Sequence, residues 1–225
     1  MSKVIVFDVD DTLLDFTACS KIALRTACAR AGIPFTDRLY DTFVSCNEKF
    51  WKQIEQGELT LAQLWKIRWN TIFSLLDIQA DGEAFETFFH GSLDDTHETM
   101  PGARQVLTVL SADHVLYAAS NGRQKQQEHR LHLAGLDTCL AGIITSELAG
   151  ANKPDPVFFD CLMDRIRQDN GDIRPEDVLL VGDSLSADIE GARSYGMKTL
   201  WFRKDGREGC GCSRLEEIIP WLNEM

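Results

Sequence analysis

Five short apolar segments recur along the chain, and each is followed within a residue or two by polar or acidic residues. These segments are Val4–Phe7, Val115–Ala119, Gly142–Thr145, Val178–Val181 and Thr199–Phe202. Uninterrupted apolar runs of this kind are typical of strands that are buried on both faces, as in parallel sheets. The pattern therefore predicts five buried strands.

Between these segments, the apolar residues recur at helical spacing. Four such stretches are Ala103–Leu110, Gln124–Ala134, Pro156–Arg167 and Ser186–Tyr195, the last of them ended by Gly196. Strands that alternate with helices predict right-handed β-α-β units, and so an α/β fold with an open, doubly wound, mostly parallel sheet. In such sheets, ligands bind beyond the carboxyl ends of the strands.

Residues 16–98 show helical periodicity and no convincing strand. Thr60 to Gln63 has the form of a capping box at the start of one helix. Apolar spacing predicts three more helices, over Ile22–Ala31, Leu39–Ile54 and Phe85–Phe89. We therefore predict a core made of residues 1–15 and 99–225, with an all-helical subdomain of residues 16–98 inserted after the first strand.

The charge composition of the chain limits the classes of partner that it could bind. The 225 residues carry a formal charge of −12, and the basic residues stand singly, so neither a nucleic acid polymer nor an anionic membrane is expected as a partner. Seven cysteines, an odd number scattered through regular segments, favour free thiols in a reducing cytoplasm. Cys210 and Cys212 lack the second ligand pair of a zinc site, so we expect exposed thiols there. A monomer or homodimer is expected.

Acidic residues directly follow the first apolar segment. While the chain stays extended, Asp8 and Asp10 project to the same side, and two carboxylates in one cavity need a cation or a shared proton. Oxygen ligands of this kind suit Mg²⁺. A calcium loop is excluded, because it would need a glycine in the sixth place and a glutamate where Cys19 stands.

Polar residues also follow three of the other apolar segments. Ser120 and Asn121 follow the second, and their hydroxyl and amide groups suit phosphate oxygens. Lys153, followed by two nearby prolines that stiffen its loop, comes after the third. Asp183 follows the fourth, with Asp188 about one helical turn beyond. Asp188 either assists a metal site or merely favours the start of its helix.

These four groups resemble, in order, the four motifs of the haloacid dehalogenase superfamily. The matching segments are DVDDT at 8–12, SN at 120–121, Lys153 with the PDP that follows it, and GDSLSAD at 182–188. The resemblance implies a Rossmann-type core, and the helical insertion is similar to the first cap type of that superfamily. Within it, residues 47–69 resemble the cap of bacterial noncanonical pyrimidine nucleotidases.

The resemblance implies a role for each motif residue. Asp8 would be the nucleophile that forms an aspartyl-phosphate, and Asp10 would be the general acid and then the general base. The Mg²⁺ ligands would be the Asp8 side chain, the Asp10 backbone carbonyl, Asp183 and Asp188, the last directly or through water. The phosphoryl oxygens would be bound by Ser120, Asn121 and Lys153.

The predicted function is thus a Mg²⁺-dependent phosphatase for a small phosphorylated metabolite, with a pyrimidine nucleoside 5′-monophosphate as the expected substrate. A sugar-phosphate phosphatase or a phosphomutase of the same superfamily is the alternative. A dehalogenase would not need an acid at position 10. A phospho-receiver domain is disfavoured by the helical insertion and by the Asp8–Asp10 spacing. A binding protein without turnover is disfavoured because every motif residue is present.

Overall fold

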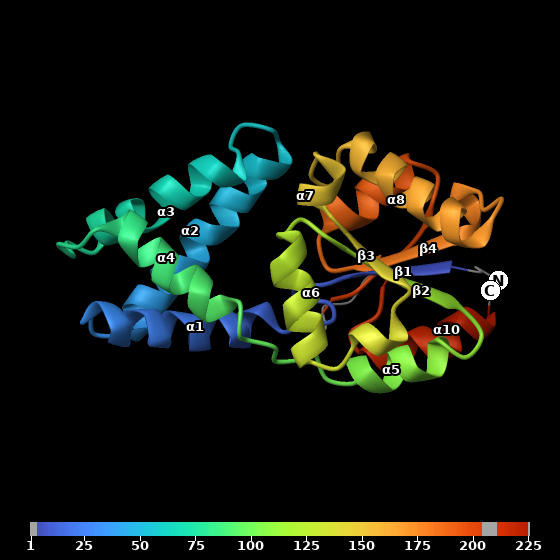
Figure 1. Ribbon diagram of the computed structural model, residues 1–225, viewed down its shortest axis with the longest axis horizontal. Coiled ribbons are helices and arrows are strands. Elements are labelled where there is room, and N and C mark those ends of the chain that lie inside the picture. The colour runs from blue at the N-terminus through green and yellow to red at the C-terminus, as the bar shows by residue number, and fades with distance from the viewer. Residues whose placement is uncertain (1–3, 204–210, 225) are drawn as a thin grey trace. The chain divides into compact units, whose positions relative to one another are not determined.

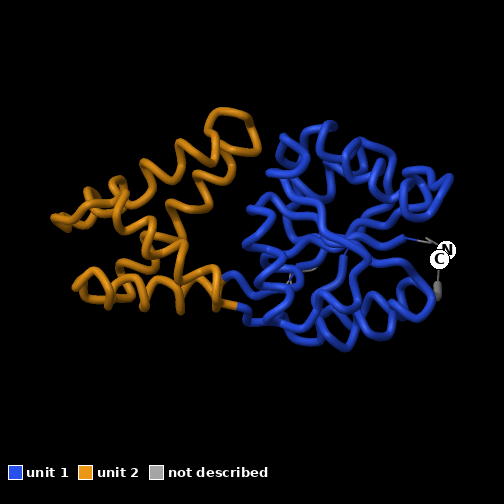
Figure 2. Tube along the Cα trace, viewed as in Figure 1, with its two compact units in different colours: residues 1–16, 97–225 blue, residues 17–96 orange. Residues whose placement is uncertain are grey.

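The computed structural model describes residues 4–203 and 211–224. The chain forms two compact units: residues 1–16 with 97–225, which we call the core unit, and residues 17–96, which we call the helical unit (Figure 2). The helical unit thus interrupts the core unit shortly after its first strand.

The core unit is built on one parallel sheet of five strands in the order β3-β2-β1-β4-β5. Its strands are β1 (Val4–Asp8), β2 (Val115–Ser120), β3 (Gly142–Thr145), β4 (Val178–Gly182) and β5 (Lys198–Trp201). The five predicted strands and the doubly wound parallel sheet are confirmed. The central strand, β1, is completely buried, as its unbroken apolar run predicts.

Helices cover both faces of the sheet (Figure 1). The α-helices of the core unit are α5 (Ala103–Leu110), α6 (Gln124–Leu133), α7 (Ser146–Ala149), α8 (Pro156–Asn170), α9 (Gly191–Ser194) and α10 (Ile218–Glu224). Short 3₁₀ turns are η1 (Asp137–Cys139), η2 (Pro175–Asp177) and η4 (Leu215–Glu217). Ile5 and Phe7 of β1 pack in the same cluster as residues of α5 and α10, whereas Val4 and Val6 pack with residues of α8. Alternate residues of one strand therefore fill two separate cores.

The stretch predicted as one helix over Ser186–Tyr195 is divided. It begins with a π-helical turn, η3 (Leu185–Glu190), and continues as the short helix α9. The backbone N–H of Ile189 bonds the carbonyl of Ser184, five residues back, which gives the wider turn. Single π turns of this kind occur often at functional sites.

The helical unit contains the four predicted helices. They are α1 (Phe16–Ala31, whose first residue belongs to the core unit), α2 (Asp37–Glu55), α3 (Leu61–Leu75) and α4 (Gly82–Leu93). The predicted capping box is present: the Thr60 hydroxyl accepts from the Gln63 N–H, and the Gln63 side chain accepts from the Thr60 N–H at 2.9 Å. Among the described residues, no helix is both long enough and apolar enough to cross a membrane.

A charged cluster is buried inside the helical unit. Arg68 of α3 donates from Nε to Glu86 Oε2 of α4 at 3.1 Å and from Nη2 to Oε1 of the same carboxylate. Its Nη1 donates to Asn47 Oδ1 at 3.1 Å, and His90 Nε2 lies 2.8 Å from Glu86 Oε1. Burial acts to raise the pKa of Glu86, but His90 and Arg68 outweigh it and hold that pKa below its ordinary value.

The cysteine prediction needs one correction. Cys212 is not exposed, because a β-bridge to Phe202 draws it into the core cluster that contains Leu215. Burial raises the pKa of its thiol to about 11, so it is unreactive at neutral pH. Cys210 lies outside the described residues.

We predict that Glu86→Gln lowers the free energy of unfolding by about 3 kcal/mol, because it leaves the buried Arg68 guanidinium without its anion. Urea denaturation followed by tryptophan fluorescence measures this. Because the folded pKa of Glu86 is lowered, its contribution is present at neutral pH and is lost as the pH falls below its ordinary value of 4.5. The difference in the free energy of unfolding between Glu86→Gln and the wild type should therefore shrink as the pH falls below 4.5.

Glu48→Gln on α2 is the control, since that carboxylate is exposed, and it should change stability by less than about 0.5 kcal/mol. Equal effects of the two substitutions would contradict a stabilising role for the Arg68–Glu86 pair.

Candidate active site

The sheet brings the predicted residues to one edge. Asp8 ends β1 and Ser120 ends β2, while Asp183 follows the last residue of β4. β1 lies between β2 and β4, with Asp8 in register with Ala119. Because the strands are parallel, their carboxyl ends lie along the same edge of the sheet. The topology therefore brings the side chains of Asp8, Ser120 and Asp183 to that edge.

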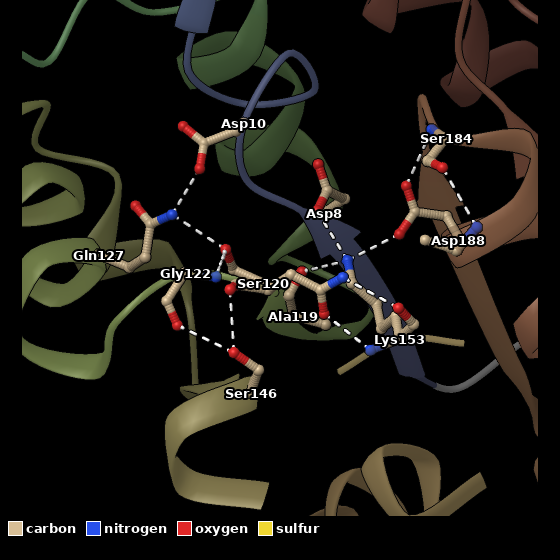
Figure 3. Close-up of polar contacts among 12 residues, drawn as sticks. Asp8, Asp10, Ala119, Ser120, Gly122, Gln127, Ser146, Lys153, Ser184 and Asp188 are labelled. Carbon is tan, nitrogen blue, oxygen red and sulfur yellow. Dashed lines mark hydrogen bonds and ion pairs between the residues drawn. The ribbon is translucent and has the colours of Figure 1, made fainter. Parts of the chain in front are cut away.

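Lys153 lies at the centre of this edge (Figure 3). Its Nζ donates to Asp8 Oδ1 at 2.7 Å, to Asp188 Oδ1 at 2.7 Å and to the Ala119 carbonyl at 2.9 Å. An ammonium group has three donors, so all three are used, although the side chain is almost completely buried. Burial acts to lower the pKa of Lys153, but Asp188 and then Asp8 outweigh it and hold that pKa above its ordinary value.

Asn121 holds the backbone of this lysine. Its Oδ1 accepts from the Lys153 N–H at 2.7 Å, and its Nδ2 donates to the Lys153 carbonyl at 3.0 Å. The Ser146 hydroxyl in turn donates to the Asn121 carbonyl at 2.9 Å. The side-chain amide of Asn121 is therefore engaged with Lys153, and the predicted contact of this residue with phosphate stays a prediction.

Three carboxylates gather around the lysine. Oxygen atoms of Asp8, Asp183 and Asp188 lie within 4.8 Å of one another. Burial is the main cause that raises the pKa of Asp8 to about 7, against the lowering effect of Lys153. Burial, with Asp8 and Asp188 as neighbours, also holds the pKa of Asp183 well above its ordinary value. One ammonium group thus leaves this cluster with an excess of negative charge.

This cluster fits a divalent cation. All three groups offer carboxylate oxygens, which hard cations such as Mg²⁺ prefer. Within the described part of the chain, the Asp183 carboxylate accepts no hydrogen bond, whereas Asp8 and Asp188 are held by Lys153. Burial and repulsion among these acids raise the pKa of Asp183, and a divalent cation held between them would relieve that repulsion.

The π-helical turn places Asp188 in the cluster. Asp188 Oδ2 accepts from the Ser184 N–H at 3.0 Å while Oδ1 faces Lys153. A Cβ atom at residue 182 would overlap the Asp188 carboxylate, so the strand must end in glycine here. The Ser184 hydroxyl accepts from the Ala187 N–H at 3.1 Å, which makes Ser184 a helix cap, as its sequence position suggests.

Asp10 belongs to a second polar network in the core unit. Gln127 Nε2 donates to Asp10 Oδ2 at 2.5 Å and to the Ser120 hydroxyl at 2.9 Å. Arg130 Nη1 donates to Asp10 Oδ1 at 2.7 Å. The sequence reasoning missed Gln127 and Arg130, although polar residues spaced three apart on one helix were a visible signal of a shared face.

The Ser120 hydroxyl is set up as a donor. It accepts hydrogen bonds from the Gly122 N–H at 3.0 Å and from Gln127 Nε2. A hydroxyl has two lone pairs and one proton, so these two bonds leave the proton to donate. An anionic oxygen beside Asp8 and Lys153 would be a suitable acceptor for it.

Comparisons with known proteins agree with this arrangement. A family model described as haloacid dehalogenase-like hydrolase matches residues 2–196. YfnB of Bacillus subtilis, named as a HAD-hydrolase, is 31% identical over 97% of this chain and 89% of its own length. Its magnesium-bound crystal structure superposes with a TM-score of 0.92 over 99% of both chains.

Of two further relatives, one is named as a nucleotidase and the other as a phosphatase. The pyrimidine 5′-nucleotidase PynA of Streptococcus pneumoniae is 31% identical over 89% of this chain and 83% of its own length. The glyceraldehyde 3-phosphate phosphatase of Pyrococcus furiosus is 26% identical over 89% of this chain and 80% of its own. From the four motifs, the parallel sheet and the family match together, the chain belongs to the haloacid dehalogenase-like hydrolases.

Proposed function

We propose that this protein is a Mg²⁺-dependent phosphatase that hydrolyses small phosphate monoesters through an aspartyl-phosphate on Asp8. The observation that carries this proposal is the buried Lys153 ammonium between Asp8 and Asp188, with the Asp183 carboxylate beside them. Placing three carboxylates, two of them buried and one half-buried, around one ammonium is unfavourable on its own. The arrangement becomes favourable when a cation and a phosphoryl group share the site.

The first step is attack by Asp8 on phosphorus. Lys153 holds Oδ1, which leaves Oδ2 to form the new bond to phosphorus as the bond to the leaving oxygen breaks. Asp10 gives its proton to that leaving oxygen, so that an alcohol departs. Ser120 donates to a phosphoryl oxygen, and the positive charge of Lys153 offsets the negative charge that is concentrated on the phosphoryl oxygens during transfer.

The second step removes the phosphoryl group from Asp8. Asp10, now a carboxylate, takes a proton from a water molecule, which attacks phosphorus and breaks the bond to Asp8. Inorganic phosphate leaves, and both acids return to their starting forms. The groups that would hold Mg²⁺ are the side chains of Asp8, Asp183 and Asp188 with the Asp10 backbone carbonyl. When bound, Mg²⁺ offsets the negative charge of these groups and of the substrate.

A pyrimidine nucleoside 5′-monophosphate is the substrate we propose. Support comes from PynA, at 31% identity, and from the resemblance of residues 47–69 to the caps of such enzymes. Trp69 is completely buried among Phe residues and is unavailable to a base, whereas Trp51 and Trp65 are partly exposed. The relative that acts on a triose phosphate makes sugar phosphates the second candidate class. The free cysteines favour the cytoplasm as its compartment.

Phosphate release from a panel of esters tests the activity and its nucleophile. The panel holds UMP, dUMP, AMP, several sugar phosphates and 4-nitrophenyl phosphate, each with Mg²⁺ and with EDTA. We predict Mg²⁺-dependent release, fastest with the pyrimidine nucleotides, and a loss of about 10⁴-fold or more in Asp8→Asn because the attacking carboxylate is gone.

Asp11→Asn is the matched control for this panel. Asp11 has a φ of 62°, a backbone conformation that Asn tolerates, and its N–H donates to the Leu14 carbonyl at 2.7 Å, so it shapes the loop. Its activity should stay within about tenfold of the wild type. Release that survives Asp8→Asn would remove the nucleophile assignment, and equal turnover of all esters would remove the pyrimidine preference.

Thermal unfolding with and without Mg²⁺ tests the metal site separately from activity. Because folding raises the pKa of Asp8 from 3.8 to about 7, the metal-free protein loses stability as the pH rises through that range. Mg²⁺ should therefore raise the melting temperature by about 5 °C at saturation near pH 8, and by less near pH 5.5.

In Asp183→Asn, one repelling carboxylate is removed. That variant should melt higher than the wild type without Mg²⁺ and show little response to the ion, while Glu48→Gln, which changes an exposed carboxylate of α2, should respond normally. A Mg²⁺ response that is absent at both pH values, or unchanged in Asp183→Asn, would contradict the assigned ligands.

A further inference from the structure

One helix of the core unit grips both oxygens of the Asp10 carboxylate. Gln127 Nε2 donates to Oδ2 at 2.5 Å and Arg130 Nη1 donates to Oδ1 at 2.7 Å, both from α6 (Figure 3 shows the Gln127 bonds). The side chain of Asp10 is 32% exposed, while that of Arg130 is 1% exposed. A buried guanidinium thus holds a carboxyl group that is partly exposed to solvent.

The orientation of the Gln127 amide follows from its neighbours. Arg130 Nη1 donates to Gln127 Oε1 at 3.0 Å, and a guanidinium has no acceptor atoms, so the oxygen end must face it. The nitrogen end therefore faces Asp10, and Nε2 donates to Oδ2 of its carboxyl group. A Cβ atom at residue 122 would lie 2.5 Å from Gln127 Nε2, so the amide is packed closely as well as bonded.

The same amide reaches the phosphate-binding serine. Gln127 Nε2 donates to the Ser120 hydroxyl at 2.9 Å as well as to Asp10. Gln127 therefore fixes Asp10, the proposed proton donor for the leaving group, relative to the Ser120 hydroxyl, which we assign to binding the phosphoryl group. Proton transfer is sensitive to this placement, because the acid must lie within hydrogen-bond reach of the leaving oxygen.

We propose that Gln127 and Arg130 are positioning residues that aim Asp10 at the leaving-group oxygen and keep it in register with Ser120. The inference rests on the proposed phosphatase function, because only there is Asp10 an acid for the leaving group. The competing explanation is that the pair merely anchors α6 to the loop after β1. The two explanations differ in how activity depends on the leaving group.

The test compares two esters that differ in their need for an acid. The first ester is the alkyl phosphate that the wild type hydrolyses fastest. Its leaving group is a strongly basic alkoxide unless a proton is transferred to it. The second ester, 4-nitrophenyl phosphate, releases a stable phenolate that needs no proton. In Arg130→Met and Gln127→Met, kcat/KM for the alkyl ester should fall by about 100-fold, and for 4-nitrophenyl phosphate by less than about fivefold. Arg130→Lys should recover part of the loss, because it keeps the charge near Asp10.

A second readout comes from kcat. The step that breaks the Asp8 phosphate is common to both esters and also uses Asp10, so in the variants kcat should fall toward one shared value for the two esters. Lys125→Ala, on the exposed side of α6, is the control and should leave the ratio of the two kcat/KM values unchanged.

The outcomes separate the explanations. The ratio of kcat/KM values does not depend on the amount of folded enzyme, and if Arg130→Met fails to fold, Gln127→Met and Arg130→Lys give the same comparison. Equal losses for both esters, or no loss, would show that the pair only anchors the helix and would overturn the proposal. A wild type that hydrolyses neither ester with Mg²⁺ would overturn the proposed function and this inference with it.

Discussion

The Lys153 ammonium group is the feature on which the rest of the site depends. It is buried, its three donors are filled by Asp8, Asp188 and the Ala119 carbonyl, and these acceptors come from segments far apart in the chain. Two local features place the groups that this ammonium needs. The Asn121 amide holds the backbone of Lys153, and the π-helical turn brings Asp188 within hydrogen-bond distance of Nζ. The Lys153 ammonium group thus holds together residues from several segments at this edge of the sheet.

The positive charge of Lys153 alone does not neutralise the carboxylates around it. Asp183 lies in the same cluster, accepts no hydrogen bond from the described residues, and has a raised pKa. The site therefore carries more negative charge than one ammonium can offset, which favours the binding of a divalent cation. The helical unit also buries charge, but there Arg68 and Glu86 balance each other within one ion pair.

The sequence predicted most of this arrangement because parallel strands carry a strong signal. Asp8, Ser120 and Asp183 each follow an apolar run, and sheet topology alone brings such positions together. Gln127 and Arg130 escaped prediction because they lie 117 and 120 residues from Asp10, and their contact depends on how α6 packs. The π turn at Leu185–Glu190 escaped prediction because one wider turn of six residues is too short to change the apolar spacing of the segment. The burial of Cys212 escaped because it depends on a bridge to Phe202.

The central claim is that Asp8 carries the phosphoryl group during turnover. The most direct measurement is to quench the enzyme in acid during hydrolysis, reduce it with borohydride, and sequence the peptides by mass spectrometry, since an acyl phosphate is reduced to an alcohol. The account predicts conversion of Asp8 to homoserine, dependent on substrate and on Mg²⁺. Steady hydrolysis with no reduction at Asp8, or with the phosphoryl group trapped on another residue, would contradict it.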